Sequence, residues 1–252
     1  MFIHNLNPIL FQLGPLQIRY YGLFFVIGFI IAYYMISYLA KKREINLTKE
    51  DVSDLLLYLI IGVIVGARIL HVLYEYEFYL NNPSQIIAVW NGGLAFHGGL
   101  IGSVISGYIF SKKKKIHFYD LADITIIPLA LALSLGRLGN FINGELYGRI
   151  TNVSWSVKFP NAEGFRHPTQ IYKSFKNFFI FSILWNLRNT KLPKGFLFWS
   201  FITLYSLIRF FIEYLVELDS LGFVIYNLTL PQIISLILFI LGIIMLFKVS
   251  KR

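Results

Sequence analysis

The segment Gly136–Arg149 concentrates polar residues directly after the apolar run Ile124–Leu135. It reads Gly-Arg-Leu-Gly-Asn-Phe-Ile-Asn-Gly-Glu-Leu-Tyr-Gly-Arg. A charge at the middle of a membrane helix costs roughly 2.5–3.5 kcal/mol, so such residues usually face a protein interior or a water-filled cavity and mark function. Guanidinium groups, amide side chains and backbone N–H groups together suit an anion site. The alternative is a polar hinge that only holds helices together.

The spacing within this segment indicates how its side chains are presented. Arg137 and Asn140 are three residues apart and share one helix face. The Asn143-Gly144 pair is typical of a turn, so the helix is expected to end or unwind there. Irregular backbone at membrane depth is tolerated only where protein or a water-filled cavity surrounds it.

A second candidate is His97, which stands between glycine pairs in Asn-Gly-Gly-Leu-Ala-Phe-His-Gly-Gly-Leu-Ile-Gly, residues 91–102. Imidazole suits proton transfer near neutral pH, and the glycines leave room for a substrate. A lone histidine on an apolar stretch is also commonly a satisfied core residue. Both interpretations stay open at this point.

Two further stripes of charge lie within apolar stretches. Arg68 shares a helical face with His71 and Glu75, and an intrahelical Arg68–Glu75 ion pair is the slightly favoured interpretation. Arg209 shares a face with Glu213 and Glu217. Because its neighbours are apolar or aromatic, a ligand role for Arg209 is as reasonable as an ion pair.

The composition that must position these residues is that of an integral membrane protein. Hydrophobic residues make up 56% of the 252-residue chain and charged residues 14%, with a mean hydropathy of +0.64. Soluble domains carry about 25% charged residues. The net charge of +10 does not indicate nucleic acid here, because many cations cluster in alternate loops and at the C-terminus, as in cytoplasmic segments.

Seven apolar spans in a single domain, residues 1–252, are predicted. The basic loops place the N-terminus outside and the C-terminus in the cytoplasm, so the outer connections are 75–93, 139–169 and 217–230. Residues 139–169 are expected to form a small outer cap, with a short strand at Val153–Phe159. The spans are 20–40, 52–74, 94–111, 121–138, 170–187, 195–216 and 231–249.

Residue types exclude several kinds of chemistry. The chain has no cysteine, so neither an enzyme thiol nor a Cys-based metal site is expected. Its five histidines form no HxxxH or HExxH pair, and Asp120 and Asp123 stand apart from any Asp-rich motif. We therefore predict no metal and no cofactor.

The segment Gly136–Arg149 closely resembles the signature of bacterial prolipoprotein diacylglyceryl transferases. Supporting matches follow in the same order as in that family and cover nearly the whole chain. They are Tyr21-Gly22-Leu23, Gly66-Ala67-Arg68, residues 91–102, His167-Pro168-Thr169-Gln170-Ile171-Tyr172, and Arg209-Phe210 with Glu213.

The resemblance implies an all-α, seven-span bacterial inner-membrane enzyme with a small periplasmic cap. Such an enzyme moves the diacylglyceryl group of phosphatidylglycerol onto the lipobox cysteine of a preprolipoprotein signal peptide. Membrane lipids surround it as further partners. It implies that Arg137 and Arg209 engage the phosphate and that His97 acts near the substrate thiol. Shaping or supporting roles fall to Tyr21, Arg68, Asn140, Asn143, Glu145, Gly148 and Glu213.

Two departures and two alternatives accompany this resemblance. Lys173 stands where the family usually carries an acidic residue, and the outer segment between Arg149 and His167 is short. Thiol activation by His97 or by the arginine field is left open. A lipid flippase or transporter is the competing class; it predicts repeated, interrupted spans, which the sequence does not display. A metal-dependent membrane transferase would need an Asp-rich motif.

Overall fold

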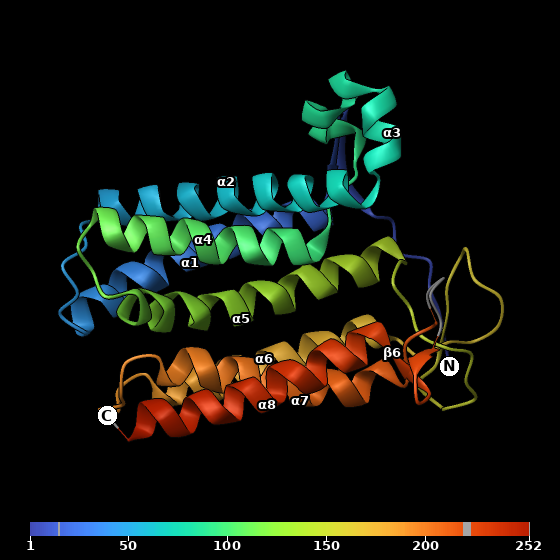
Figure 1. The fold of residues 1–252 in the computed structure, drawn as a ribbon. Coiled ribbons are helices and arrows are strands. Elements are labelled where there is room, and N and C mark those ends of the chain that lie inside the picture. The colour runs from blue at the N-terminus through green and yellow to red at the C-terminus, as the bar shows by residue number, and fades with distance from the viewer. Residues whose placement is uncertain (15, 219–222, 252) are drawn as a thin grey trace. The chain divides into compact units, whose positions relative to one another are not determined.

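The computed structural model describes residues 1–14, 16–218 and 223–251 and divides into two compact units (Figure 1). One unit comprises Met1–Tyr34 and Asp123–Arg252, and the other comprises Met35–Ala122. Residues 219–222 of the predicted outer connection 217–230 lie outside the described residues. The prediction of a single domain, residues 1–252, stays a prediction.

Long helices dominate the described residues. Five of them, α1, α2, α5, α7 and α8, are long and apolar enough to cross a membrane. α4 and α6 have 18 and 19 residues but are more polar, because α4 is rich in glycine and serine and α6 carries two lysines. The long helices are α1 (Tyr20–Lys42), α2 (Lys49–Tyr74), α4 (Phe96–Lys113), α5 (Phe118–Asn143), α6 (Thr169–Leu187), α7 (Phe196–Glu213) and α8 (Leu230–Ser250).

Short strands pair outside the helices, and the structure is mostly helical, as the all-α prediction requires. β1 (Phe2–Ile3) pairs in parallel with β4 (Val157–Lys158), which is shorter than the predicted strand. Two hairpins pair β2 (Ile9–Leu13) with β3 (Leu16–Arg19) and β5 (Phe223–Ile225) with β6 (Leu228–Thr229). The protein is mostly helical, and its polar connections satisfy their backbone groups by local pairing.

In the unit Met35–Ala122, α2 and α4 lie side by side (Figure 1). Glycines on both helices form the contact between them. A Cβ on Gly66 would collide with the Gly98 carbonyl oxygen, and a Cβ on Gly102 would collide with the Gly62 carbonyl oxygen. Small residues at such positions let membrane helices approach until their backbones touch. This close packing fixes the first turn of α4, where His97 lies. The short helices α3 (Tyr76–Asn81), η1 (Pro83–Ile87) and η2 (Val89–Asn91) connect α2 to α4.

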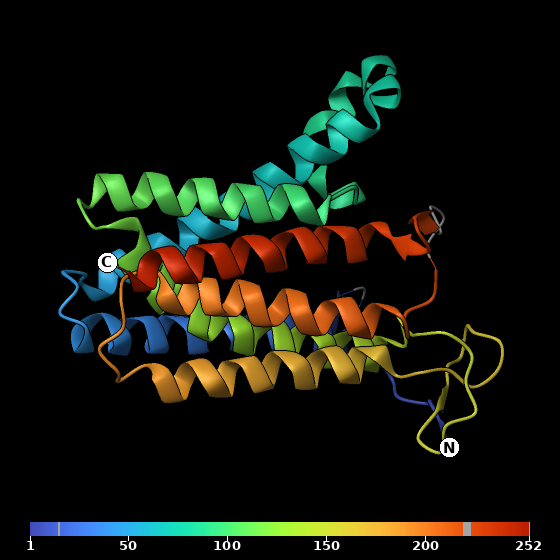
Figure 2. The ribbon, with the colours of Figure 1, turned by 60° about the horizontal axis from the view of Figure 1, so that its bottom comes forward.

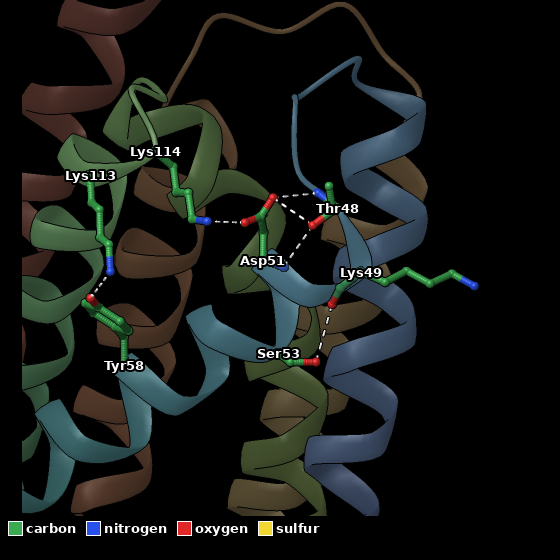
Figure 3. A network of polar contacts seen from close by, with 7 residues as sticks. All are labelled: Thr48, Lys49, Asp51, Ser53, Tyr58, Lys113 and Lys114. Carbon is green, nitrogen blue, oxygen red and sulfur yellow. Dashed lines mark hydrogen bonds and ion pairs between the residues drawn. The ribbon is translucent and has the colours of Figure 1, made fainter.

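The opposite end of this unit is held by a polar network at the start of α2 (Figure 3). Thr48 caps α2 by accepting from the Asp51 backbone N–H, and the Asp51 carboxylate accepts from Thr48 in return. Asp51 also forms an ion pair with Lys114, which follows α4 and whose pKa this contact raises. Lys113 Nζ donates to the Tyr58 hydroxyl at 3.0 Å. The network therefore ties the end of α4 to the start of α2.

In the other unit, α5 is bonded to both α6 and α7. The Asp123 carboxylate accepts from the backbone N–H groups of Gly195 and Phe198 at 2.9 and 2.8 Å, so it caps the start of α7. Farther along α5, buried Ser134 and Ser174 of α6 exchange hydrogen bonds. α7 packs on both α6 and α8 (Figure 2).

Candidate active site

The end of α5 carries a chain of side-chain hydrogen bonds. Arg137 Nη1 donates to Asn140 Oδ1 at 3.3 Å, and Asn140 Nδ2 donates to Glu145 Oε1 at 2.8 Å. Asn143 Nδ2 donates to the same Glu145 oxygen at 3.1 Å. α5 ends at Asn143, and Gly144 follows with a φ of +69°, which allows the sharp turn that returns Glu145 toward the helix. Four predicted site residues thus form one network.

Tyr21 of α1 approaches this network over a glycine. A Cβ on Gly139 would lie 2.8 Å from the Tyr21 ring and 3.1 Å from its Cα, so any larger residue there would push Tyr21 away. Tyr21 lies within electrostatic reach of Asn140, Glu145 and Arg137. The structure therefore brings Tyr21 to the residues with which it was predicted to act.

Two cavities lie in this unit, next to the network. The larger has a volume of about 540 Å³, and its lining includes Glu145, Tyr147, Asn161, Lys173 and Glu213. The smaller has a volume of about 20 Å³ and is lined by Arg137, Lys173, Lys176, Tyr205, Arg209 and Ile212. Lys173 lines both cavities.

The two arginines predicted to act together do meet at the smaller cavity. Arg137 comes from α5 and Arg209 from α7. Arg209 Nη1 donates to the Tyr205 hydroxyl, one turn earlier, at 3.4 Å. Paired guanidinium groups at one cavity are suited to a phosphate, because each can present two parallel N–H donors to its oxygens. The contact of these residues with a substrate stays a prediction.

The predicted stripe of Arg209, Glu213 and Glu217 is wrong in its last member. α7 ends at Glu213, so Glu217 lies beyond the helix. Its Oε1 forms an ion pair with Arg166 Nη1 at 2.7 Å, and the same nitrogen donates to the Gly148 carbonyl oxygen at 3.2 Å. Glu217 therefore joins the segment after α7 to Arg166, and both Glu213 and Glu217 line the larger cavity.

Gly148 lies in a tight backbone contact within the segment that connects α5 to α6. A Cβ there would collide with the Leu215 carbonyl oxygen and would lie 2.6 Å from Thr169 Cγ2. Its N–H donates to the His167 carbonyl oxygen at 2.9 Å. Burial lowers the pKa of His167, whose ring Nδ1 is 3.2 Å from the Tyr172 hydroxyl oxygen. Gly148 thus joins the segment after α5 to the segment after α7; its predicted role in binding stays untested.

Arg68, in the other unit, does not make the expected ion pair with Glu75. Its guanidinium is buried and donates from all three nitrogens to backbone carbonyl oxygens of the segment that connects α2 to α4. Its Nε bonds to Ile86 at 2.9 Å, and its Nη1 bonds to Gly92 at 2.6 Å. The other acceptors are the carbonyl oxygens of Gln85, Ala88 and Gly93. Because its five N–H groups face five carbonyls, Arg68 serves to position residues 85–93.

Arg68→Lys is expected to loosen this segment. An ammonium has three donors rather than five, so carbonyls within the fold lose their partners at roughly 1–3 kcal/mol for each unsatisfied group. We expect a lower unfolding temperature in detergent and faster proteolysis within residues 83–93. Arg19→Lys, at an exposed side chain that bonds only to Gln17 in the structure, is the matched control. Unchanged stability and protease resistance in Arg68→Lys would contradict the positioning role.

His97 occupies the first turn of α4 and is partly buried. Its ring packs edge-on against Phe96, with 5.7 Å between ring centroids. The residues that follow it, Gly98 and Gly99, are buried against α2. His97 is therefore held at the start of a well-packed helix, in the same unit as Arg68, and its catalytic role stays a prediction.

Lys176 lines the smaller cavity but was not among the site residues expected from the sequence. It is 6% exposed, and its ammonium nitrogen lies 3.2 Å from the centroid of the Tyr205 ring. The available signal was a second lysine three residues after Lys173 within the predicted span 170–187, since intramembrane ionisable residues usually have a function. Among the described residues, no group of three or more His, Asp or Glu side chains forms a possible metal site.

Several apolar helices indicate a multi-pass membrane protein, and α5, α6 and α7 enclose a small cavity lined by cationic side chains. Residues 8–248 match the family model described as prolipoprotein diacylglyceryl transferase. The chain is 42% identical over 252 residues to the phosphatidylglycerol–prolipoprotein diacylglyceryl transferase of Geobacter sulfurreducens, covering 98% of this chain and 97% of that protein. It is 40% identical over 255 residues to the protein of the same name from Rickettsia bellii, with the same coverage. The chain belongs to the prolipoprotein diacylglyceryl transferase family, which confirms the resemblance.

Proposed function

We propose that this chain transfers the diacylglyceryl group of phosphatidylglycerol to the lipobox cysteine thiol of preprolipoprotein signal peptides. The reaction forms a thioether and releases glycerol phosphate, as the first step of lipoprotein maturation. Family membership supports the activity, and its relatives are named as phosphatidylglycerol–prolipoprotein diacylglyceryl transferases. The observation that carries the site is that Arg137 and Arg209, from different helices, line one cavity.

The chemistry requires a thiolate nucleophile and a leaving phosphate whose developing charge is held. In our proposal the guanidinium groups of Arg137 and Arg209 bind the phosphate oxygens and are preorganised for that charge, which is usually the largest catalytic effect. Tyr21, Asn140, Asn143, Glu145 and Gly148 shape the pocket, with Glu213 at its edge. His97 acts at the thiol proton, and Arg68 acts indirectly by positioning residues 85–93.

We further propose that the chain is one transferase domain with seven spans in the bacterial inner membrane. The N-terminus and the cap of residues 139–169 are periplasmic, and the C-terminus is cytoplasmic. Two contacts support the placement of the N-terminus and the cap on the same side of the membrane. The terminal amine donates to the Ser154 carbonyl oxygen at 2.6 Å, and β1 pairs with β4. The positive-inside rule supports the orientation.

Single cysteines test this orientation cleanly, because the chain has none of its own. Cysteines at Lys113 and Asn189, both exposed, should react with a membrane-impermeant maleimide only from the cytoplasmic side. A cysteine at exposed Asn161, in the cap, should react only from outside. The measurement is labelling of intact spheroplasts against inverted vesicles. Labelling of the Asn161 variant from the cytoplasmic side would overturn the orientation.

The proposed activity is tested with purified protein, phosphatidylglycerol and a lipobox peptide. Mass spectrometry should find one diacylglyceryl group on the peptide cysteine and glycerol phosphate in solution. A peptide with serine in place of cysteine is the control, because an alcohol of much higher pKa than a thiol gives no comparable nucleophile. Folded protein that leaves the cysteine peptide unmodified would contradict the proposal.

A further inference from the structure

The smaller cavity holds more positive charge than one phosphodiester needs. Four of its six lining residues are cationic: Arg137, Lys173, Lys176 and Arg209. None of the six carries a carboxylate, and the described carboxylate within electrostatic reach of both lysines is Glu213. Buried cations are costly unless an opposite charge compensates them. Four cationic side chains with one carboxylate within reach of the lysines are therefore suited to a multiply charged anion.

Lys176 is the most informative member of this group. At 6% exposure it is almost fully withdrawn from solvent, and its ammonium lies over the Tyr205 ring rather than beside a carboxylate. The Tyr205 hydroxyl also accepts from Arg209, so one tyrosine contacts both cations from the α7 side. A cation–π contact compensates a buried ammonium only in part. An anion bound in the cavity would therefore supply the opposite charge that Lys176 lacks there and stabilise its protonated form.

Charge balance in the proposed reaction identifies a suitable anion. The substrate phosphate is a diester with one negative charge. When the thiolate sulfur attacks the glycerol carbon, the carbon–oxygen bond breaks and its electron pair goes to the phosphate oxygen. The thiol proton has already left to a base or to solvent. The released phosphomonoester carries close to two negative charges near neutral pH.

We propose that Lys173 and Lys176 form, with the two arginines, a binding site for a phosphate dianion, the glycerol phosphate leaving group. This inference rests on the proposed function. The small cavity now has room for about one water molecule, and Lys173 also lines the larger cavity. The phosphate reaches the cations from the larger cavity, on the side lined by Lys173. Lys176 then contacts the oxygen on which charge develops, so it stabilises the product more than the substrate.

The test compares two soluble anions on purified full-length protein at a pH of about 8, where the monoester is dianionic. These anions are glycerol phosphate, a monoester, and glycerophosphoglycerol, a diester with one charge. The wild type should bind the monoester more tightly, as measured by calorimetry. Lys176→Met should weaken monoester binding by about ten-fold or more, as expected for a lost hydrogen bond to a charged group, and change diester binding by less than about three-fold. Its kcat should fall while KM for phosphatidylglycerol stays within about three-fold of the wild type.

Controls keep this test decisive. Methionine has a similar length to lysine and suits an apolar helix, and Lys191→Met at an exposed lysine should leave both affinities unchanged. If Lys176→Met fails to fold, Lys176→Gln replaces it with the same expected results. Equal losses for both anions, or unchanged monoester affinity, would overturn the proposal. Because binding needs no turnover, Lys176-dependent monoester binding in a protein without transferase activity would instead count against the proposed function alone.

Discussion

Arg137→Lys is expected to insert and fold normally and to lose at least about ten-fold in turnover. Each transition-state contact of this kind is worth roughly 2.7–4 kcal/mol. Lysine keeps the positive charge but loses the planar fork that binds two phosphate oxygens. Since three other cations line the same cavity, charge is abundant there and geometry is what the substitution removes.

The measurement is turnover of phosphatidylglycerol with the lipobox peptide, together with the unfolding temperature of each variant. Arg19→Lys, at an exposed residue of β3, controls for the substitution itself. Arg137 also donates to Asn140, so the variant should loosen the Asn140–Glu145 network slightly. Turnover near the wild-type value in a folded Arg137→Lys protein would remove Arg137 from the phosphate role.

His97→Gln is expected to lose activity strongly at neutral pH and to recover part of it as the pH rises. If His97 is the general base, its loss removes a contribution of roughly 10²–10⁴ in rate. The free cysteine thiol has a pKa of about 8.5, so the substrate thiolate forms without help at alkaline pH. The ratio of wild-type to variant rate should therefore shrink between neutral and alkaline pH.

A pH–rate profile at saturating lipobox peptide measures this ratio. His117→Gln, at an exposed histidine after α4, is the control and should follow the wild-type profile. His97 begins a helix whose next residues pack closely on α2, so a change in geometry alone would persist at every pH. A flat ratio across the range would exclude the base role and leave thiol activation to the arginine-rich field.

The site residues whose arrangement was predicted correctly are those that lie close together in the sequence. Arg137, Asn140, Asn143 and Glu145 lie within nine residues of one another, so a helix end and one turn are enough to bring them together. The ranges of the long helices also followed from apolar length. α5 extends five residues beyond the predicted end at Leu138, because its polar residues continue the helix rather than leave it.

The residues that the sequence misplaced depend on the path of connecting segments. The sequence predicted an ion pair between Arg68 and Glu75 on one face of the same helix. In the structure, Arg68 instead donates to carbonyl oxygens that are 17 to 25 residues away in the chain. No periodicity encodes how residues 83–93 fold back over a helix end. Lys176 could be recognised only as a charge in an apolar helix, since its place beside Arg209 depends on how α6 packs against α7.

The carboxylate of Asp123 sets the depth at which two distant arginines meet. It accepts from the N–H of Gly195, so the start of α7 lies beside Asp123 of α5. Because Arg137 and Arg209 lie farther along these helices and line one cavity, the two helices run in the same direction. Arg137 follows Asp123 by 14 residues, and Arg209 follows Gly195 by 14 residues. At 1.5 Å per residue, each arginine lies roughly 21 Å along the helix axis from the contact between Asp123 and Gly195, so the two guanidinium groups lie at the same level. The position of the proposed phosphate site along the helices is therefore set by two helical segments of equal length that start at the contact between Asp123 and Gly195.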